Sequence, residues 1–583
     1  MQWWQPNGLQ YCNQQSEIQT QNNHFMLRVV LLFAICVLCV LPAAHSAEST
    51  PNKAVSYSSN QAVQPIQISL EQHLQSGRLP QLGITLPNAA SLYELYRPYG
   101  FEPLWQPLYR AHNPLQDLLA YLQQIQLHGL LARDYHYQTL QQQCQLPAAE
   151  LVAEIAAECD LLQSDAILSL TQHLLVGKVD PELLFEKTLL EKPLLDLSHW
   201  FQMALNSKTL SHYFAKIEPK SQDYHLLKDY LALLSSLSAP EWQPLALKPS
   251  IKPQMSDPRL ALIIERLVFW GDLSADWMHQ APYALVYKGE LVIAVETFQL
   301  RHGLEADGVL GKNTIAALNV SPQQRVEQLL VNLERIRWYA HKPVGRLIKV
   351  NIPSFELTAY EDGKVSLKKA VIVGQTERQS PIFEDRIQYL VMNPTWIVPW
   401  KLATRDKLPL IQEDPQYLVE NGFSVYQNGE KLTSPTQIDW NQVSKYQFPY
   451  RLIQAPGRKN ALGQVKFMFP NPYEVYLHDT PAKSLFKKDL RAFSSGCIRV
   501  QEPMELVWWL LRSDGLSDID IKKQLNKKYT NTVYLASQVP VRLEYRTAFL
   551  ADDQSIQFRA DIYQRDSKLY QALQQPVTSH LLH

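Results

Sequence analysis

The spacing of apolar residues changes along the chain from a helical to an alternating period. Between about residues 66 and 245, apolar residues recur every three to four positions, as in Leu115, Leu118, Leu119 and Leu122. This period predicts amphipathic helices packed on a common core. From Ile348 to Ile352 and beyond, apolar and polar residues alternate instead, which predicts β-strands. The pattern therefore predicts helices first and a strand-rich region later.

Capping residues mark where several of the helices begin and end. Asn113-Pro114 and Ser321-Pro322 each combine an N-cap residue with a first-turn proline, so we expect a helix to begin at both. His128-Gly129 is expected to close the first of these helices. The helix from Ser321 is expected to reach about Tyr339, and another helix or helix pair covers about 155–175.

Strand-like runs follow one another in the C-terminal half. A turn at Asp362-Gly363 separates two of them. The strand pattern lapses from about 403 to 459, where Pro, Asn, Gln and Tyr are frequent, and it returns at 463–469. Residues 531–563 are strand-like again, with a hairpin turn expected at Asp552-Asp553, and the tail from Lys568 is expected to be helical.

An uncharged apolar run near the N-terminus resembles an export signal. Residues 29–44 follow Arg28 and end in small residues, which is the order of a secretory signal that starts at Met26. A retained membrane anchor is the alternative, although the run is shorter than the roughly 20 apolar residues of a membrane span. With either interpretation, we expect most of the chain to lie outside the cytoplasm.

Composition excludes some classes of function. The 583 residues predict several domains, and 46% hydrophobic with 19% charged residues is ordinary for globular proteins with sizeable cores. The formal net charge of −1 argues against nucleic-acid binding, which needs a basic surface.

The cysteines beyond the apolar run are three. Cys144 and Cys159 could form a disulfide in an oxidising compartment and leave Cys497 free, or they could be separate buried thiols. No HExxH motif occurs, and no CxxC motif lies beyond the apolar run, so no motif supports a zinc site.

A histidine and a cysteine in the C-terminal half have the context of a nucleophilic site. His478 follows a strand-like run, and Cys497 follows small residues and precedes Arg499. A thiol needs a neighbouring base or cation to become a nucleophile at neutral pH, and His478 is the candidate base. The small residues Ser495 and Gly496 would leave backbone N–H groups uncovered for an oxyanion. Arg499 would share a strand face with Cys497 and hold the thiolate or a substrate carboxylate.

These residues carry a resemblance to a known family. Ser494-x-Gly496-Cys497-x-Arg499, with a strand-borne histidine 19 positions before the cysteine (497 − 478), resembles the YkuD-type catalytic domain of L,D-transpeptidases, which cross-link peptidoglycan. The commoner pattern has Gly after the histidine, where this chain has Asp479. In that respect residues 478–500 are similar to the large, multi-domain YcbB-like branch of the family. Asp479 is then either a partner of the site or a turn residue.

A second resemblance covers residues of about 255–320. Phe298-Gln299, His302-Gly303-Leu304, Asp307-Gly308, Gly311 and Thr314 resemble the three-helix peptidoglycan-binding domain type 1. The alternative is a helical hairpin that only spaces its neighbours.

Pattern and resemblance together predict an α+β multidomain protein. We expect a helical scaffold domain, a small three-helix peptidoglycan-binding domain and a mostly-β YkuD-type catalytic domain with a capping insertion. The expected segments are a signal peptide or anchor at 26–47, a linker at 48–65, the scaffold at 66–250, the peptidoglycan-binding-like domain at 255–320, and the catalytic domain at 345–566 with its cap at 403–460. The cap is either a moving lid or a fixed insertion.

The resemblance implies a mechanism and a set of site residues. Cys497 would attack the donor tetrapeptide, release D-alanine and form a thioester that an amine of a neighbouring stem converts into a 3→3 cross-link. The implied residues are Cys497 and His478 for catalysis, Ser495, Gly496 and Arg499 for the oxyanion and orientation, and Tyr476, Ser494 and Trp396 for substrate. The resemblance implies no metal or organic cofactor, a periplasmic location, inactivation by carbapenems and contact with wall-synthesis proteins.

Two other functions remain compatible with the sequence. A hydrolase or carboxypeptidase could use the same Cys497–His478 pair with water as the acceptor. A wall-binding scaffold with an inert catalytic unit is the second alternative, although the complete His478, Cys497 and Arg499 set argues against it.

Overall fold

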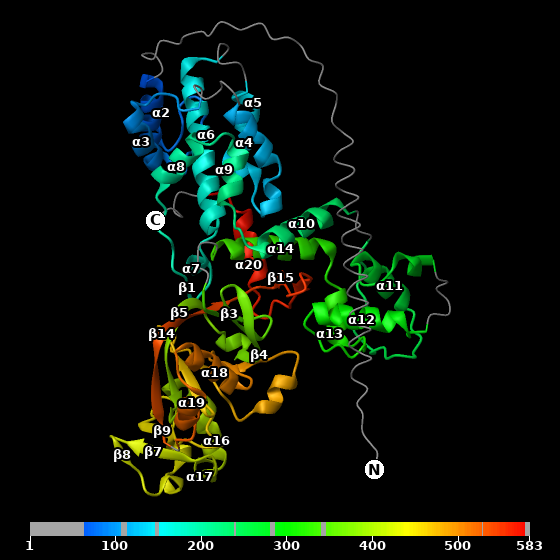
Figure 1. The fold of residues 1–583 in the computed structure, drawn as a ribbon, viewed down its shortest axis with the longest axis vertical. Helices are drawn as coiled ribbons and strands as arrows, with labels where there is room; N and C mark the ends of the chain where they lie inside the picture. The colour runs from blue at the N-terminus through cyan, green and yellow to red at the C-terminus, as the bar shows by residue number, and fades with distance from the viewer. Residues whose placement is uncertain are drawn as a thin grey trace. The chain divides into compact units, whose positions relative to one another are not determined.

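The computed structural model describes residues 63–105, 113–145, 151–237, 241–279, 286–339, 345–527 and 529–577. They fall into two compact units, residues 241–321 and residues 63–237 together with 322–577 (Figure 1). The expected export signal at 26–47 and most of the expected linker lie outside the described residues. Within the described part, no helix is long and apolar enough to span a membrane.

The smaller unit is helical around one core. Its main helices are α11 (Leu260–Phe269), α12 (Glu290–Arg301) and α13 (Lys312–Leu318). Gln299 ties the turn between the last two, because its side chain donates to Asp307 and Thr314 and accepts from the Gly308 N–H. The motif residues of the resemblance therefore hold the turn together. Leu245 belongs to this core, so the unit begins before the expected residue 255.

Most scaffold helices of the larger unit pack against the longest of them, α6. The helices are α2 (Val63–Ser76), α3 (Ala89–Tyr96), α4 (Pro114–Gln123), α5 (Tyr137–Gln143), α6 (Ala153–Val176), α7 (Pro181–Leu184), α8 (Leu197–Leu205), α9 (Leu210–Ile217) and α10 (Gln222–Ser236). Asn113 caps α4 as expected, accepting from two backbone N–H groups. Cys144 and Cys159 form a disulfide, which decides between the two interpretations of these cysteines.

The catalytic region is a sheet that closes on itself. Its strands are β2 (Leu347–Asn351), β3 (Glu356–Glu361), β4 (Lys364–Gly374), β5 (Ile382–Met392), β10 (Val465–Met468), β11 (Leu477–His478), β12 (Ala492–Ser494), β13 (Ile498–Val500) and β14 (Asn531–Glu544). Pairing runs from β5 through β10, β11, β13, β4, β3, β2 and β14 back to β5. Helices α18 (Pro503–Ser513) and α19 (Asp518–Leu525) contribute to its apolar core.

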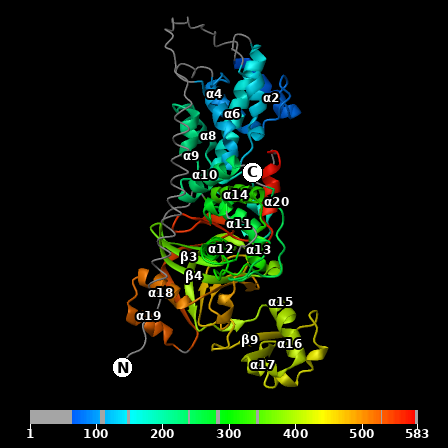
Figure 2. The ribbon, with the colours of Figure 1, turned by 90° about the vertical axis from the view of Figure 1, so that its right-hand side faces the viewer.

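The segment from β6 to β9 forms a cap with its own core (Figure 2). It contains β6 (Trp396–Ile397), α15 (Trp400–Leu402), a π-helical turn (Ala403–Lys407), α16 (Leu408–Glu413), α17 (Gln416–Glu420), β7 (Phe423–Gln427), β8 (Glu430–Lys431) and β9 (Tyr450–Gln454). The lapse in alternation at 403–459 predicted a segment without strands, but β7, β8 and β9 lie inside it. These strands are short and half-exposed, so alternation is weak there.

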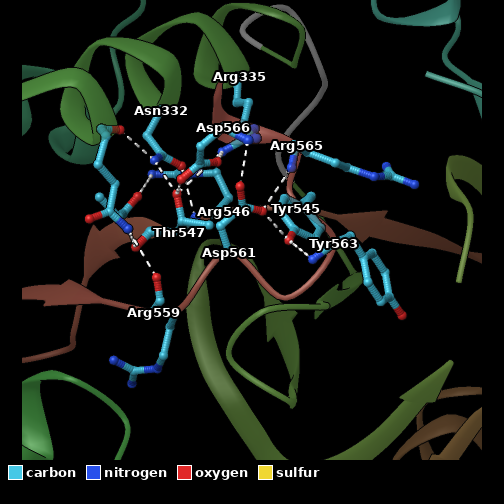
Figure 3. Close-up of polar contacts among 12 residues, drawn as sticks. Asn332, Arg335, Tyr545, Arg546, Thr547, Arg559, Asp561, Tyr563, Arg565 and Asp566 are labelled. Atoms are coloured by element: carbon cyan, nitrogen blue, oxygen red, sulfur yellow. Dashed lines mark hydrogen bonds and ion pairs between the residues drawn. The ribbon is translucent and has the colours of Figure 1, made fainter. Parts of the chain in front are cut away.

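Polar contacts join the scaffold to the catalytic region. Helix α14 (Pro322–Arg337) and helix α20 (Asp566–Gln574) meet through an ion pair of 2.6 Å between Arg335 and Asp566 (Figure 3). The Lys178 ammonium donates to the Leu573 and Gln575 carbonyls at 2.7 Å. Strand β1 (Thr188–Leu189) also pairs with β5. The scaffold and the catalytic region therefore form one compact unit.

Candidate active site

Three basic side chains from neighbouring strands lie side by side on one face of the sheet. The register pairs Lys466 of β10 with His478 of β11, and His478 with Arg499 of β13. Side chains alternate between the two faces of a strand. The alternate positions of these strands fill the main core, namely Phe467, Leu477 and Ile498. His478 is therefore flanked by a cation on each side.

The backbone of the next residue orients the His478 ring. Nδ1 lies 2.5 Å from the Asp479 carbonyl oxygen, and because a carbonyl only accepts, Nδ1 carries the proton. Nε2 is then the unprotonated, basic nitrogen. The Asp479 carboxylate accepts from the Gln464 N–H and from Lys483, so it fixes the backbone whose carbonyl holds the ring. Asp479 is thus a supporting residue of the site.

Cys497 lies immediately before β13, beside the end of β11. Its sulfur lies 3.9 Å from the Glu474 carbonyl oxygen, and the Tyr476 N–H donates to it. The Ile498 N–H donates to the Tyr476 carbonyl, which ties the segment after the cysteine to the segment before the histidine. This parallel pairing of β11 with β13 brings the two predicted catalytic residues to neighbouring strands.

Burial keeps both catalytic groups neutral at neutral pH. Desolvation, together with the positive charge of Arg499, lowers the pKa of His478 to about 3. Desolvation also raises the pKa of Cys497 to about 11, against the opposing effects of the Tyr476 N–H and the cations Arg499 and Lys466. In the resting site the cysteine is therefore a thiol and the histidine a neutral imidazole, so an attack by Cys497 on a substrate requires loss of the thiol proton.

Alkylation of Cys497 by iodoacetamide should therefore have an alkaline pH profile. We expect the second-order rate to rise about tenfold per pH unit from pH 7 to 10, because the thiolate fraction rises until the pH reaches the pKa. An ordinary free thiol, with a pKa of about 8.5, should level off earlier. Far-UV circular dichroism at each pH controls for unfolding. A rate that levels off by pH 8 would contradict the neutral resting pair.

Hydrogen bonds shape the segment of residues 494–497, which we call the nucleophile loop because it carries the candidate nucleophile. The Ser494 hydroxyl donates to the Cys497 carbonyl at 2.5 Å and accepts from the Gly496 N–H at 3.1 Å. Ser494 is 2% exposed and shapes the loop through these bonds, and its contact with a substrate stays a prediction. The Gly496 N–H donates to the Ser494 hydroxyl, and its role as an oxyanion donor stays a prediction. The Cys497 N–H donates to no acceptor among the described residues.

Family comparisons match three segments of the chain. Residues 345–521 match the YkuD family, described as "L,D-transpeptidase catalytic domain". Residues 90–231 match a scaffold domain, and residues 278–318 match a "Putative peptidoglycan binding domain". These matches confirm the predicted organisation of helical scaffold, peptidoglycan-binding domain and mostly-β catalytic domain.

A curated relative decides the family. A Haemophilus influenzae protein named "Putative L,D-transpeptidase" is 32% identical over 366 residues, which cover 59% of this chain and 74% of the relative. The chain belongs to the L,D-transpeptidase family. Membership in the YcbB-like branch stays a prediction.

Two crystal structures of L,D-transpeptidases are more distant. The match to the Xylanimonas cellulosilytica structure has 14% sequence identity and a TM-score of 0.15, and it covers 52% of this chain and 100% of that structure's chain. The Stackebrandtia nassauensis structure is 15% identical, covers 50% of this chain and 96% of its own, and has a TM-score of 0.17.

Aromatic residues of this L,D-transpeptidase connect the site with the cap. The Tyr476 ring lies 5.6 Å from the His478 ring and packs against the core of the cap, and the Lys466 ammonium lies 5.5 Å from its centre. Trp396 lies inside that core, 8% exposed and next to Phe423. Substrate contacts by Trp396 and by Tyr476 stay predictions.

One arginine of the transpeptidase joins the cap to the nucleophile loop. Arg378, after β4, donates to both carboxylate oxygens of Asp406 in the cap at 2.5 and 2.6 Å. The same guanidinium donates to the Ser495 hydroxyl at 2.8 Å. Ser495 is exposed beside Cys497, and a donor role of its N–H stays a prediction.

Two residues near the site could not be recognised from the sequence. Lys466 and Arg378 are basic residues of a kind that is common on protein surfaces. Only the strand register could have shown Lys466, since it faces His478 from another strand. Among the described residues, no cluster of three or more His, Cys, Asp or Glu side chains could hold a metal ion.

Proposed function

We propose that this chain forms 3→3 cross-links in peptidoglycan through a thioester on Cys497. The observation that carries the proposal is the pairing of β11 with β13, which brings His478 and Cys497 to neighbouring strands, together with the Asp479 carbonyl that holds Nδ1–H of His478 and leaves Nε2 as the basic nitrogen. This pair lies in a domain that matches the L,D-transpeptidase catalytic domain. The donor is a stem tetrapeptide that ends in D-alanine.

Acylation begins with proton transfer from the Cys497 thiol to Nε2 of His478. The sulfur forms a bond to the carbonyl carbon of the third residue, and the carbonyl oxygen becomes an oxyanion. The Cys497 N–H donates to this oxyanion. The C–N bond to D-alanine then breaks, the amine takes the proton from Nε2, and the thioester remains.

Deacylation repeats these steps with a second stem as nucleophile. The side-chain amine of its third residue attacks the thioester carbonyl and loses a proton to His478. The C–S bond breaks, and the departing sulfur takes that proton back as the thiol. The products are a new amide cross-link and the starting enzyme, so no cofactor is consumed.

The flanking cations suit a substrate that ends in a carboxylate. Lys466 and Arg499 lie on the two sides of His478 in the register, and both favour the ionised form of Cys497. Either charge could pair with the D-alanine carboxylate of the donor, because charge-assisted bonds to carboxylates are the strongest available to a peptide end. This orients the scissile bond towards the sulfur.

We further propose that the protein acts in the periplasm on the cell wall. The apolar run at 29–44 favours export, and the Cys144–Cys159 disulfide suits an oxidising compartment. The match of residues 278–318 to a "Putative peptidoglycan binding domain" supports binding of the cell wall by the smaller unit. Contacts with other wall-synthesis proteins would follow from this location.

Incubation with disaccharide tetrapeptides, followed by mass spectrometry, tests the reaction. We expect release of D-alanine together with a dimer joined between the two third residues. The Cys497→Ser variant serves as the matched control and should give neither product. Release of D-alanine with only tripeptide monomers would identify water as the acceptor, and therefore a carboxypeptidase. No D-alanine from the native, folded protein would reject the proposed chemistry.

A further inference from the structure

The peptide bond between Gly496 and Cys497 carries the proposed oxyanion donor. In a trans peptide the C=O and N–H groups point in opposite directions, so holding one of them directs the other. Gly496 has a φ of +120°, which is a region that only glycine adopts readily. The backbone next to this peptide is therefore intrinsically permissive, and the direction of the Cys497 N–H needs an external constraint.

A buried serine outside the nucleophile loop supplies such a constraint. The Ser380 hydroxyl donates to the Gly496 carbonyl at 2.7 Å and accepts from the Gly374 N–H at 2.9 Å. Ser380 is 0% exposed, so water does not compete for either bond. The bond to Ser380 fixes the direction of the Gly496 carbonyl, so the Cys497 N–H points the opposite way, where it donates to no acceptor among the described residues.

A tyrosine fixes Ser380 in turn. The Tyr563 hydroxyl donates to the Gly374 carbonyl at 2.5 Å and accepts from the Ser380 N–H at 3.2 Å. The Tyr563 ring stacks on the Tyr545 ring, with 5.6 Å between the ring centroids. The backbone N–H of Tyr563 donates to the Tyr545 hydroxyl at 2.8 Å. Tyr545 donates to Asp561 in the same polar cluster (Figure 3). The support therefore comes from the segments that follow β14.

The turn that carries Ser380 has no room to shift towards β4. A Cβ atom on Gly374 would lie 2.1 Å from the Arg378 carbonyl oxygen and 2.8 Å from the Ser380 nitrogen. The backbones of residues 374 and 378–380 are thus in direct contact. This rigid contact holds the Ser380 hydroxyl at one place relative to the sheet.

We propose that Ser380 is a positioning residue that aims the Cys497 N–H at the oxyanion by holding the Gly496 carbonyl. The inference rests on the proposed acylation of Cys497. It assigns Ser380 no contact with the substrate, because the side chain is 0% exposed and its hydroxyl proton is donated to the Gly496 carbonyl.

Two reactions of the same thiol test the inference. Acylation by a carbapenem passes through an oxyanion, whereas alkylation by iodoacetamide displaces iodide and needs no oxyanion donor. In Ser380→Ala we expect acylation to slow by about tenfold to a hundredfold, somewhat less than the 10²- to 10³-fold loss from deleting a donor outright. Alkylation should stay within about twofold of the native rate, since the thiol itself is untouched. Ser380→Thr keeps the hydroxyl and should recover acylation.

A second variant covers the case in which Ser380→Ala does not fold. Tyr563→Phe keeps the stacked ring and removes only the hydroxyl that holds Ser380, so it should slow acylation severalfold at unchanged alkylation. Native acylation rates in both variants would overturn the inference, and so would equal losses of acylation and alkylation. A native protein that is alkylated but never acylated would instead overturn the proposed function on which the inference rests.

Discussion

Replacing Cys497 by alanine is expected to abolish covalent trapping by a carbapenem and the release of D-alanine. Deleting the nucleophile of a protease costs about 10⁶-fold in kcat, and no second nucleophile replaces it. Cys497 is the free cysteine of the described residues, since Cys144 and Cys159 are joined. Intact-mass measurement after mixing with a carbapenem should therefore show one adduct on the native protein and none on the variant.

The Cys497→Ala variant should remain folded. The sulfur makes one weak contact of 3.9 Å to a carbonyl and a bond from the Tyr476 N–H, so its loss removes little packing. A thermal melting curve that matches the native protein establishes this. An adduct that persists in the variant would place the nucleophile elsewhere. No adduct on the native, folded protein would favour the wall-binding scaffold or a cap that blocks the site.

Replacing His478 by alanine is expected to slow acylation by about 10²- to 10⁴-fold, the usual contribution of a general base. With a thiol pKa of about 11, Cys497 is almost fully protonated at neutral pH and depends on a base to lose its proton. The variant should regain activity with rising pH as hydroxide replaces the imidazole. The native rate should not fall on the acid side until the pH approaches the His478 pKa of about 3, provided that the fold persists.

A scaffold histidine provides the matched control for His478. His199 is exposed on α8, so His199→Ala should acylate at the native rate. The measurement is the acylation rate of the three proteins from pH 5 to 10, with melting temperatures beside it. Equal pH profiles for native protein and His478→Ala would remove His478 from the mechanism.

Local sequence patterns correctly predicted helix starts and a hairpin turn, which depend on residues close together in the chain. Asn113-Pro114 marked the start of α4, Ser321-Pro322 that of α14, and Asp552-Asp553 the hairpin between β15 (Ala548–Leu550) and β16 (Ile556–Phe558). Each signal lies within a few residues of its effect, because caps and turns are short-range hydrogen bonds. The cap region was harder to predict, since its short strands are half-exposed and alternate weakly.

The limits of the domains were decided by packing. Leu245 resembles the end of the helical region in sequence, but it is buried in the core of the smaller unit. Strand β1 comes from the scaffold segment, yet it pairs with β5 of the sheet. Such contacts join residues far apart along the chain, so the local spacing of apolar residues cannot predict them.

The sequence by itself determined the family of this protein and predicted its chemistry, a cysteine nucleophile with a histidine base 19 positions earlier. Only the tertiary structure decided how that chemistry is supported. The register across β10, β11 and β13 places Lys466 beside His478, and the turn after β4 brings Ser380 to the Gly496 carbonyl. Residue types with distinctive reactivity are recognisable in a short motif. Supporting residues are ordinary serines and lysines, and only the long-range pairing of strands gives them their roles.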